Sequence, residues 1–140
     1  MIAVLNGVNL NLLGRRDPTH YGSLTLSALE SQIYAWANEH GQTARCFQTN
    51  HEGAFVEHLH ECVGWANGVI VNPGAWTHYS YAIRDAVDFL EMPVVEVHLS
   101  DIEAREPFRH HSVIADVVTH RIVGKGADGY REAITWLSLR

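Results

Sequence analysis

Polar and apolar side chains alternate in the segment VVEVHLS, residues 94–100. Because successive side chains of a strand point to opposite faces, Glu96, His98 and Ser100 are expected to share one face. A carboxylate beside an imidazole orients the ring and favours its protonated form, which would make this pair a candidate general acid. A partly exposed strand end in which Glu96 and His98 only satisfy each other gives the same pattern. The segment alone favours neither interpretation.

The segment NLLGRRDPTHYGS, residues 11–23, has no helical or strand period and is predicted to be a loop. It carries Arg15, Arg16 and Tyr21 between glycines that could act as hinges. Neighbouring guanidinium charge favours the phenolate form of a tyrosine. A closing loop of this kind could therefore supply a strong base for removing a proton next to a carbonyl. The alternative is an ordinary solvated basic loop.

A third segment, NPGAWTHYSYAIRDA at residues 72–86, is predicted to be a strand end, a loop and the start of a helix. The free N–H groups and positive dipole end of such a helix favour an anion nearby, where Asn72 and His78 also lie. In the alternative interpretation this is a capping loop in which Thr77 or His78 caps the helix. Asp85 follows within the helix, where a charged residue is usually only solvated.

Two arginines in AREPFRHHS, residues 104–112, are spaced four apart. If the segment is helical, Arg105 and Arg109 lie on one face and could bind a carboxylate or hydroxyl groups. The alternative is a surface helix with salt bridges to Glu103 and Glu106.

Other reactive residue types do not form a recognisable site. His58 and His60 are two apart, so on a helix they do not share a face, and no metal site is predicted. Cys46 and Cys62 form no CxxC pair, which argues against a disulfide framework and a cysteine zinc site. Lys125, the only lysine, lies between glycines in a predicted loop without a phosphate-loop pattern.

Composition limits the class of protein. The 140 residues, 46% hydrophobic, are expected to form one domain spanning 1–140. A net charge of −6 disfavours nucleic-acid and membrane-surface partners, so an anionic ligand would need a local basic site. The opening MIAVLNG lacks the basic start of a signal peptide, and no apolar run approaches membrane-spanning length. We therefore expect a soluble, cytoplasmic protein.

Strand-like and helical segments alternate along the chain. Strands are predicted at 1–7, 43–50, 68–74, 93–100 and 120–124, and helices at 24–41, 53–68, 79–90 and 128–139. This alternation predicts an α/β fold with a parallel sheet covered on both faces, and five units fit a flavodoxin-like doubly wound, three-layered sheet of order 2-1-3-4-5. Ligands of such sheets bind at the carboxyl ends of the strands, at the switch between the first and third strands.

Three segments together, LNGVNLNLLGRRDPTHYG, NPGAWTHYSYAIRDA and VVEVHLSDIEAREPFRHHS, resemble the type II 3-dehydroquinate dehydratases. The resemblance extends over about residues 2 to 137. It implies a hydro-lyase that converts 3-dehydroquinate into 3-dehydroshikimate by reversible anti elimination of water through an enol or enolate. It implies no metal and no cofactor, a role in aromatic amino acid biosynthesis or in quinate breakdown, and a homododecamer built from trimers.

The resemblance also implies roles for individual residues. Tyr21 corresponds to the base, and Arg16 to the residue that favours its phenolate form. His98 corresponds to the general acid that protonates the departing hydroxyl group, with Glu96 as its partner. Asn9 corresponds to the residue that holds a water molecule against the enolate oxygen. The implied substrate contacts are Asn72, His78, Leu99, Ser100, Arg109 and Arg105, together with Asp85, which in the family reaches a neighbouring subunit's site.

The sequence departs from the family pattern at Val8, where proline is usual, and at Lys125, where an apolar residue is common. Neither change removes a group with an implied catalytic role, and an imine mechanism at Lys125 is not expected. One alternative is a flavodoxin-like binding module without catalysis, which would bind a small hydroxy acid without forming product. A flavin-binding protein is a third option, although no phosphate-binding loop follows the first strand.

Overall fold

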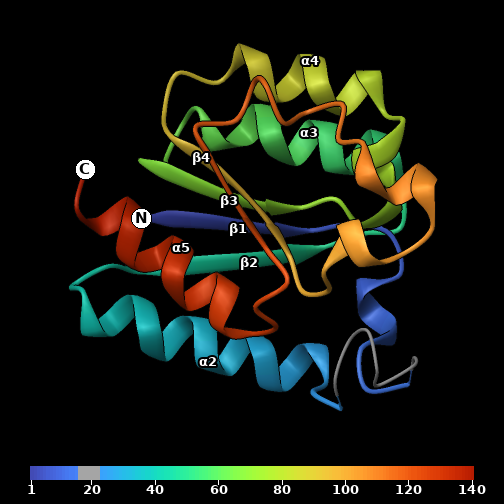
Figure 1. Cartoon of the computed structure of the whole chain (residues 1–140). Coiled ribbons are helices and arrows are strands. Elements are labelled where there is room, and N and C mark those ends of the chain that lie inside the picture. Colours follow the sequence, from blue (N-terminus) through green and yellow to red (C-terminus); the bar gives the residue numbers. More distant parts are fainter. Residues whose placement is uncertain (16–22) are drawn as a thin grey trace.

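The computed structural model describes residues 1–15 and 23–140 of the chain. Its five strands form one parallel sheet in the order β2-β1-β3-β4-β5, which confirms the expected flavodoxin-like topology (Figure 1). The strands are β1 (Ile2–Asn6), β2 (Ala44–Gln48), β3 (Gly68–Asn72), β4 (Val94–His98) and β5 (His120–Val123).

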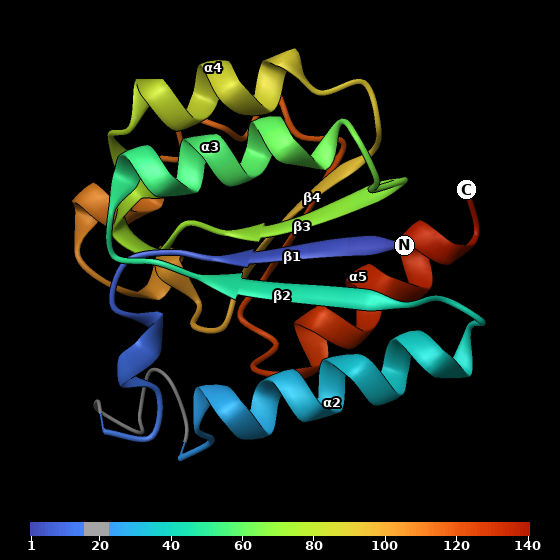
Figure 2. The same cartoon turned by 180° about the vertical axis from the view of Figure 1, so that it is seen from behind.

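Four α-helices in the described part of the chain cover the two faces of this sheet. They are α2 (Leu26–Glu39), α3 (Glu52–Cys62), α4 (Tyr81–Phe89) and α5 (Asp128–Ser138). Helices α3 and α4 lie on one face, and α2 and α5 lie on the other (Figures 1 and 2). None of the helices in the described ranges is long and apolar enough to cross a membrane.

Helix boundaries differ from the predicted ones by a few residues. The largest difference is at α3, which ends at Cys62 rather than near residue 68 because the chain turns at Val63–Trp65. The predicted start of α4 also moves. Residues 74–78 form a separate 3-10 turn, η2, and Ser80 is the N-cap of α4, accepting a hydrogen bond from the Ile83 N–H at 3.1 Å.

Side-chain alternation along the strands produces two apolar cores. On β1, Ile2 and Val4 pack toward α2 and α5, whereas Ala3 and Leu5 pack toward α3 and α4. The same alternation continues on β3 and β4. Both cores are polar at the carboxyl edge of the sheet. Toward α5 lie Asn6 and Asn72, the last residues of β1 and β3, and toward α4 lie Glu96 and His98 on β4.

Close backbone approach shapes this edge of the sheet. A Cβ atom on Gly7 would lie 2.5 Å from the carbonyl oxygen of Pro73, so only glycine lets the ends of β1 and β3 meet here. Gly74 has a φ of +65°, which favours glycine, and its Cβ would lie 2.7 Å from the Val8 carbonyl oxygen. The segments that follow β1 and β3 are therefore held against each other at the switch point, where a ligand site was expected.

Candidate active site

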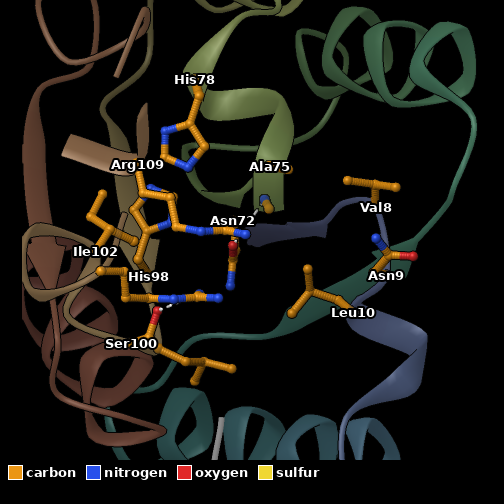
Figure 3. Close-up of a pocket in the computed structure, with 13 residues that line it drawn as sticks. Val8, Asn9, Leu10, Asn72, Ala75, His78, His98, Ser100, Ile102 and Arg109 are labelled. Atoms are coloured by element: carbon orange, nitrogen blue, oxygen red, sulfur yellow. Dashed lines mark hydrogen bonds between the residues drawn. The ribbon is translucent and has the colours of Figure 1, made fainter. Parts of the chain in front are cut away.

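A pocket of about 130 Å³ opens at the carboxyl ends of β1, β3 and β4 (Figure 3). Its lining includes eight of the residues predicted from the sequence, which are Asn9, Asn72, His78, His98, Leu99, Ser100, Arg105 and Arg109. Val8, Leu10, Gly74, Ala75 and Ile102 complete it. Two other predicted residues, Arg16 and Tyr21, lie outside the described residues.

The backbone at Asn9 fixes one wall of the pocket. Asn9 has a φ of 69°, in the left-handed region that asparagine tolerates better than most residues. Its N–H donates to the Asn50 Oδ1 at 2.8 Å, and the Gln48 Nε2 donates to the same oxygen at 3.0 Å. The loop after β2 thus holds the loop after β1, and the exposed Asn9 side chain lies at the pocket.

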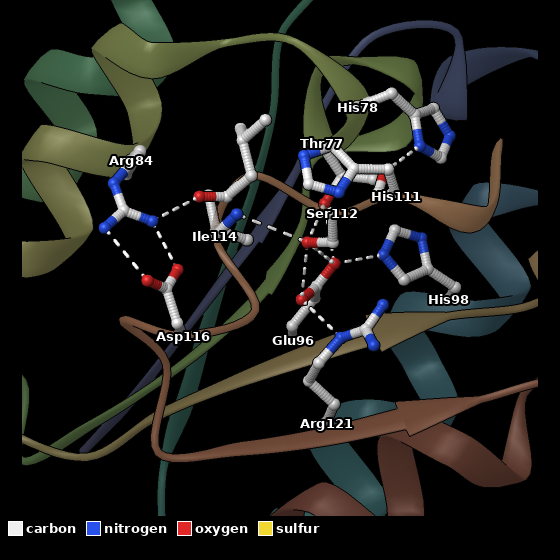
Figure 4. A network of polar contacts seen from close by, with 11 residues as sticks. Thr77, His78, Arg84, Glu96, His98, His111, Ser112, Ile114, Asp116 and Arg121 are labelled. Atoms are coloured by element: carbon white, nitrogen blue, oxygen red, sulfur yellow. Dashed lines mark hydrogen bonds and ion pairs between the residues drawn. The ribbon is translucent and has the colours of Figure 1, made fainter. Parts of the chain in front are cut away.

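A buried carboxylate stands behind the pocket. Glu96 is 0% exposed, and four residues donate hydrogen bonds to it (Figure 4). His98 Nε2 donates to its Oε2 at 2.5 Å, and Thr77 Oγ1 donates to the same oxygen at 2.6 Å. Arg121 Nε donates to its Oε1 at 2.8 Å, and Ser112 Oγ lies 3.0 and 3.1 Å from the two oxygens. A buried charge is tolerated when it is paired and hydrogen-bonded in this way.

These donors keep Glu96 ionised. Burial by itself would raise the pKa of this carboxyl group. The hydrogen bonds and charges from His98, Thr77 and Arg121 outweigh burial and lower the pKa of Glu96 from 4.5 to about 2. Glu96 is therefore a fixed negative charge throughout the neutral range and can only accept hydrogen bonds.

Ionised Glu96 should make folding stability depend on pH. Because its pKa is lower in the folded chain than the ordinary 4.5, its stabilisation is complete above about pH 4.5. It is lost as the pH falls from 4.5 toward 2. At 1.36 kcal/mol per pKa unit this amounts to about 3 kcal/mol. Urea unfolding at several pH values should show a smaller acid loss for Glu96→Gln than for the unmodified chain.

Glu39→Gln is the matched control for this measurement, because Glu39 is exposed and contacts only Arg131, at 3.6 Å, among its described salt-bridge partners. It should lose stability with acid as the unmodified chain does. Equal acid losses in Glu96→Gln and Glu39→Gln would show that Glu96 does not set this pH dependence.

The two pocket histidines have different roles in hydrogen bonding. A carboxylate only accepts, so His98 Nε2 carries a proton, and Nδ1 is the ring nitrogen left for a ligand. His98 is 5% exposed and lines the pocket.

His78 Nδ1 must donate to the carbonyl oxygen of His111, at 2.8 Å, which leaves Nε2 toward a ligand. Burial lowers the pKa of His78 below its ordinary value, although the bond to His111 opposes this. His78 is therefore a neutral acceptor.

The arginine pair reaches the pocket without the expected helix. Residues 104–112 do not form one helix, because Pro107 starts a new 3-10 turn, η4 (Pro107–His110), after η3 (Ile102–Ala104). The condition for a shared helix face, a helix over both arginines, is therefore not met. Arg105 and Arg109 nevertheless both line the pocket. Arg105 Nη1 donates weakly to Ser100 Oγ at 3.4 Å, and Arg109 Nε contacts the exposed Glu106 at 3.2 Å.

Three residues around Glu96 were not predicted as part of the site. Thr77 was considered only as a helix cap, but Ser80 caps α4 and the Thr77 hydroxyl donates to Glu96. Ser112 and Arg121 come from the loop before β5 and from β5 itself. The one signal in the sequence was the polar triplet of β4, which needs partners for its carboxylate. It did not indicate which residues would supply them.

Other residues considered from the sequence lie apart from the pocket. Asp85 is exposed on α4 and is not part of the pocket lining. Lys125 forms an exposed ion pair with Glu132 at 2.7 Å. The ring of His58 stacks on Phe47, with 4.6 Å between ring centroids, and His60 packs edge-on against Phe89.

The pocket thus combines two arginines and two histidines, with a buried carboxylate behind them, on a chain whose net charge is −6. Positive charge and hydrogen-bond donors favour a small anionic ligand carrying several oxygens. The paired Glu96 and His98 add acid–base chemistry to this binding site. Fold and site together define a flavodoxin-like α/β protein with an acid–base pocket at its switch point.

Comparisons with known proteins lead to one family. The family model described as dehydroquinase class II matches residues 1–138. The 3-dehydroquinate dehydratase of Leptothrix cholodnii is 53% identical over 130 residues, which cover 92% of this chain and 87% of the relative. That of Pelobacter propionicus is 52% identical over 134 residues, covering 95% and 90%. The crystal structure of type II dehydroquinase from Propionibacterium acnes has a TM-score of 0.96 and 42% identity, covering 99% of this chain and 96% of that one.

The chain belongs to the class II dehydroquinase family. It is accordingly an enzyme, a hydro-lyase, as the resemblance of its three motifs implied.

Proposed function

We propose that the chain catalyses the reversible anti elimination of water from 3-dehydroquinate to give 3-dehydroshikimate. One observation carries this proposal: the buried Glu96–His98 pair lies at the back of a pocket that Arg105 and Arg109 also line. The substrate is a carboxylate with a hydroxyl group β to a ketone. The arginines suit the carboxylate of the substrate, and the His98 acid beside Glu96 suits the departing hydroxyl group.

The elimination needs a base, stabilisation of an oxyanion and an acid. In the proposed reaction the Tyr21 phenolate removes the proton next to the ketone, and the electron pair of that C–H bond forms the enolate. Asn9 holds the water molecule that donates a hydrogen bond to the enolate oxygen. His98 then gives a proton to the hydroxyl group as its C–O bond breaks, the alkene forms and water leaves.

The remaining predicted residues would bind the substrate. We assign the carboxylate to the backbone N–H groups of Leu99 and Ser100, just beyond the end of β4, with Arg105 nearby. His78 Nε2 is an acceptor and suits a substrate hydroxyl group, whereas the Asn72 amide and Arg109 suit oxygen acceptors. No step of this scheme requires a metal or a cofactor.

The test is a direct assay of the metal-stripped protein with 3-dehydroquinate, following the ultraviolet absorbance of the conjugated enone product. A rise that persists with a chelator is the expected result. If absorbance does not rise but calorimetry shows that the substrate binds, the chain is a binding module and the proposed reaction is wrong. If there is neither product nor binding, the substrate itself is wrong.

We also propose that the enzyme works in the cytoplasm, in aromatic amino acid biosynthesis or in quinate breakdown, as a dodecamer built from trimers. Family membership supports this assembly, and so does Asp85, which is exposed and lies away from the pocket of its own chain. Light scattering should give a mass twelve times the 15.7 kDa of one chain. A mass of one chain at micromolar concentration would contradict the assembly.

A further inference from the structure

A second buried polar cluster lies on the opposite face of the sheet from Glu96, and the proposed reaction gives two of its three members no role. It consists of Asn6, Asn72 and Tyr130. Asn6 and Asn72 are partners in the register of β1 and β3, and Tyr130 comes from the first turn of α5. Asn6 and Tyr130 are 0% exposed and Asn72 is 3% exposed. Unpaired polar groups here would be costly, so their hydrogen bonds are informative.

One chain of hydrogen bonds connects the three side chains. Asn72 Nδ2 donates to the Tyr130 hydroxyl oxygen at 2.9 Å, and this hydroxyl group donates to Asn6 Oδ1 at 2.6 Å. Burial raises the pKa of Tyr130 well above its ordinary value, so the hydroxyl group keeps its proton. A hydroxyl group has a single proton to donate. Because that proton goes to Asn6, Tyr130 can only accept from Asn72.

The Gly74 N–H and the Tyr130 hydroxyl group together fix the orientation of the Asn72 amide, one at each end. The Gly74 N–H donates to Asn72 Oδ1 at 3.1 Å. If the Asn72 amide were flipped, its nitrogen would face the Gly74 N–H, and its oxygen would face the hydroxyl oxygen of Tyr130. The contact with Gly74 would place two donors against each other and would be repulsive. The contact with Tyr130 would draw the hydroxyl hydrogen bond from Asn6 to Asn72. Asn6 Nδ2 is buried and has no hydrogen-bond partner among the described residues, a cost that accompanies the orientation of its oxygen toward Tyr130.

The fixed orientation of the Asn72 amide determines what it offers to a ligand in the pocket. Of the three residues only Asn72 is part of the described pocket lining (Figure 3). One N–H of its Nδ2 goes to Tyr130, which leaves the second N–H for a ligand. Asn72 is therefore a donor in advance of binding, suited to a hydroxyl or carbonyl oxygen of a substrate.

We propose that Tyr130 is a positioning residue for the reaction, which holds the Asn72 amide in the orientation that donates to an oxygen of the bound substrate. Asn6 acts behind it by accepting the hydrogen bond that the Tyr130 hydroxyl group donates. This inference rests on the proposed function, because it concerns the same pocket and the same substrate. Tyr130 itself does not touch the substrate in this scheme. Its effect on turnover must therefore disappear when Asn72 has no amide.

Steady-state kinetics with 3-dehydroquinate on a double-mutant cycle tests this. Tyr130→Phe removes only the hydroxyl group and should lower kcat/KM about tenfold, which is what the loss of one oriented hydrogen bond costs. Asn72→Ala should lower kcat/KM at least as much. Tyr130→Phe added to Asn72→Ala should cost nothing further.

Ile134→Val is the matched control, because Ile134 is also fully buried on α5 and the change shortens a side chain in the same core. It should keep kcat/KM unchanged well below its Tm. Should Tyr130→Phe behave as this control does, or should it cost another tenfold in the Asn72→Ala background, Tyr130 is only structural and the proposal is wrong.

Asn6→Ala gives a second test that keeps the tyrosine in the core if Tyr130→Phe does not fold. With its acceptor gone, the Tyr130 proton is free to turn toward Asn72. The loss in kcat/KM should again be absent in the Asn72→Ala background, and additive losses would overturn the proposal. The unmodified chain in the same assay distinguishes a failure of the proposed function from a failure of the role of Tyr130. No turnover by it rejects the proposed function and this role together, whereas normal turnover with additive losses rejects only the role of Tyr130.

Discussion

His98→Gln is expected to lower kcat for 3-dehydroquinate by about 10² to 10⁴, the usual contribution of a general acid. Glutamine can still donate a hydrogen bond to Glu96, so the buried carboxylate keeps a partner and the fold should persist. It cannot give up a proton to the departing hydroxyl group. Initial rates by ultraviolet absorbance, together with calorimetry of substrate binding, should show a large loss in kcat with little loss in affinity.

His78→Gln is the matched control, because His78 lines the same pocket but is a neutral hydrogen-bond acceptor. Its replacement should raise KM more than it lowers kcat. If His98→Gln keeps a kcat within tenfold of the unmodified chain, His98 is not the acid. If His78→Gln shows the larger kcat loss, His78 rather than His98 is the general acid.

Tyr21→Phe is expected to abolish measurable turnover while the fold and substrate binding remain. Removing a proton next to a ketone requires a strong base, and the described pocket residues offer none. His98 is the acid of the proposed reaction, so its Nδ1 must hold the proton for the departing hydroxyl group. Burial lowers the pKa of His78, which makes it a weaker base. The family resemblance assigns the base to Tyr21. Product formation should be followed at high enzyme concentration, so that a small residual rate is detected.

Arg16→Ala tests how Tyr21 becomes a base. If Arg16 favours the phenolate form, its removal should cost several powers of ten in kcat at neutral pH. Part of that loss should return as the pH rises toward about 10, where an unassisted tyrosine ionises. Tyr34→Phe, a change on the exposed side of α2, should have no effect.

Near-normal turnover by Tyr21→Phe would remove the tyrosine from the mechanism.

Most of the fold could be predicted from local patterns. Apolar runs such as 68–72 indicate buried strands, and amphipathic runs such as 24–41 indicate helices with one buried face. Their alternation predicts a parallel sheet and limits the strand order to a few possibilities. Element ends were less certain. The helix considered over 104–112 is two 3-10 turns, because Pro107 cannot continue a helix hydrogen bond.

The sequence by itself determined which chemistry is available. The alternation in β4 placed Glu96 and His98 on one face, and the strand-end rule brought Asn9 and Asn72 to the same edge, because both follow from backbone geometry within a few residues. Only the tertiary structure decided which residues form hydrogen bonds with the site residues from behind the pocket. Tyr130 lies 58 residues from Asn72 in sequence, and Arg121 lies 25 from Glu96. Contacts at such separations depend on how whole elements pack, and no local period records them.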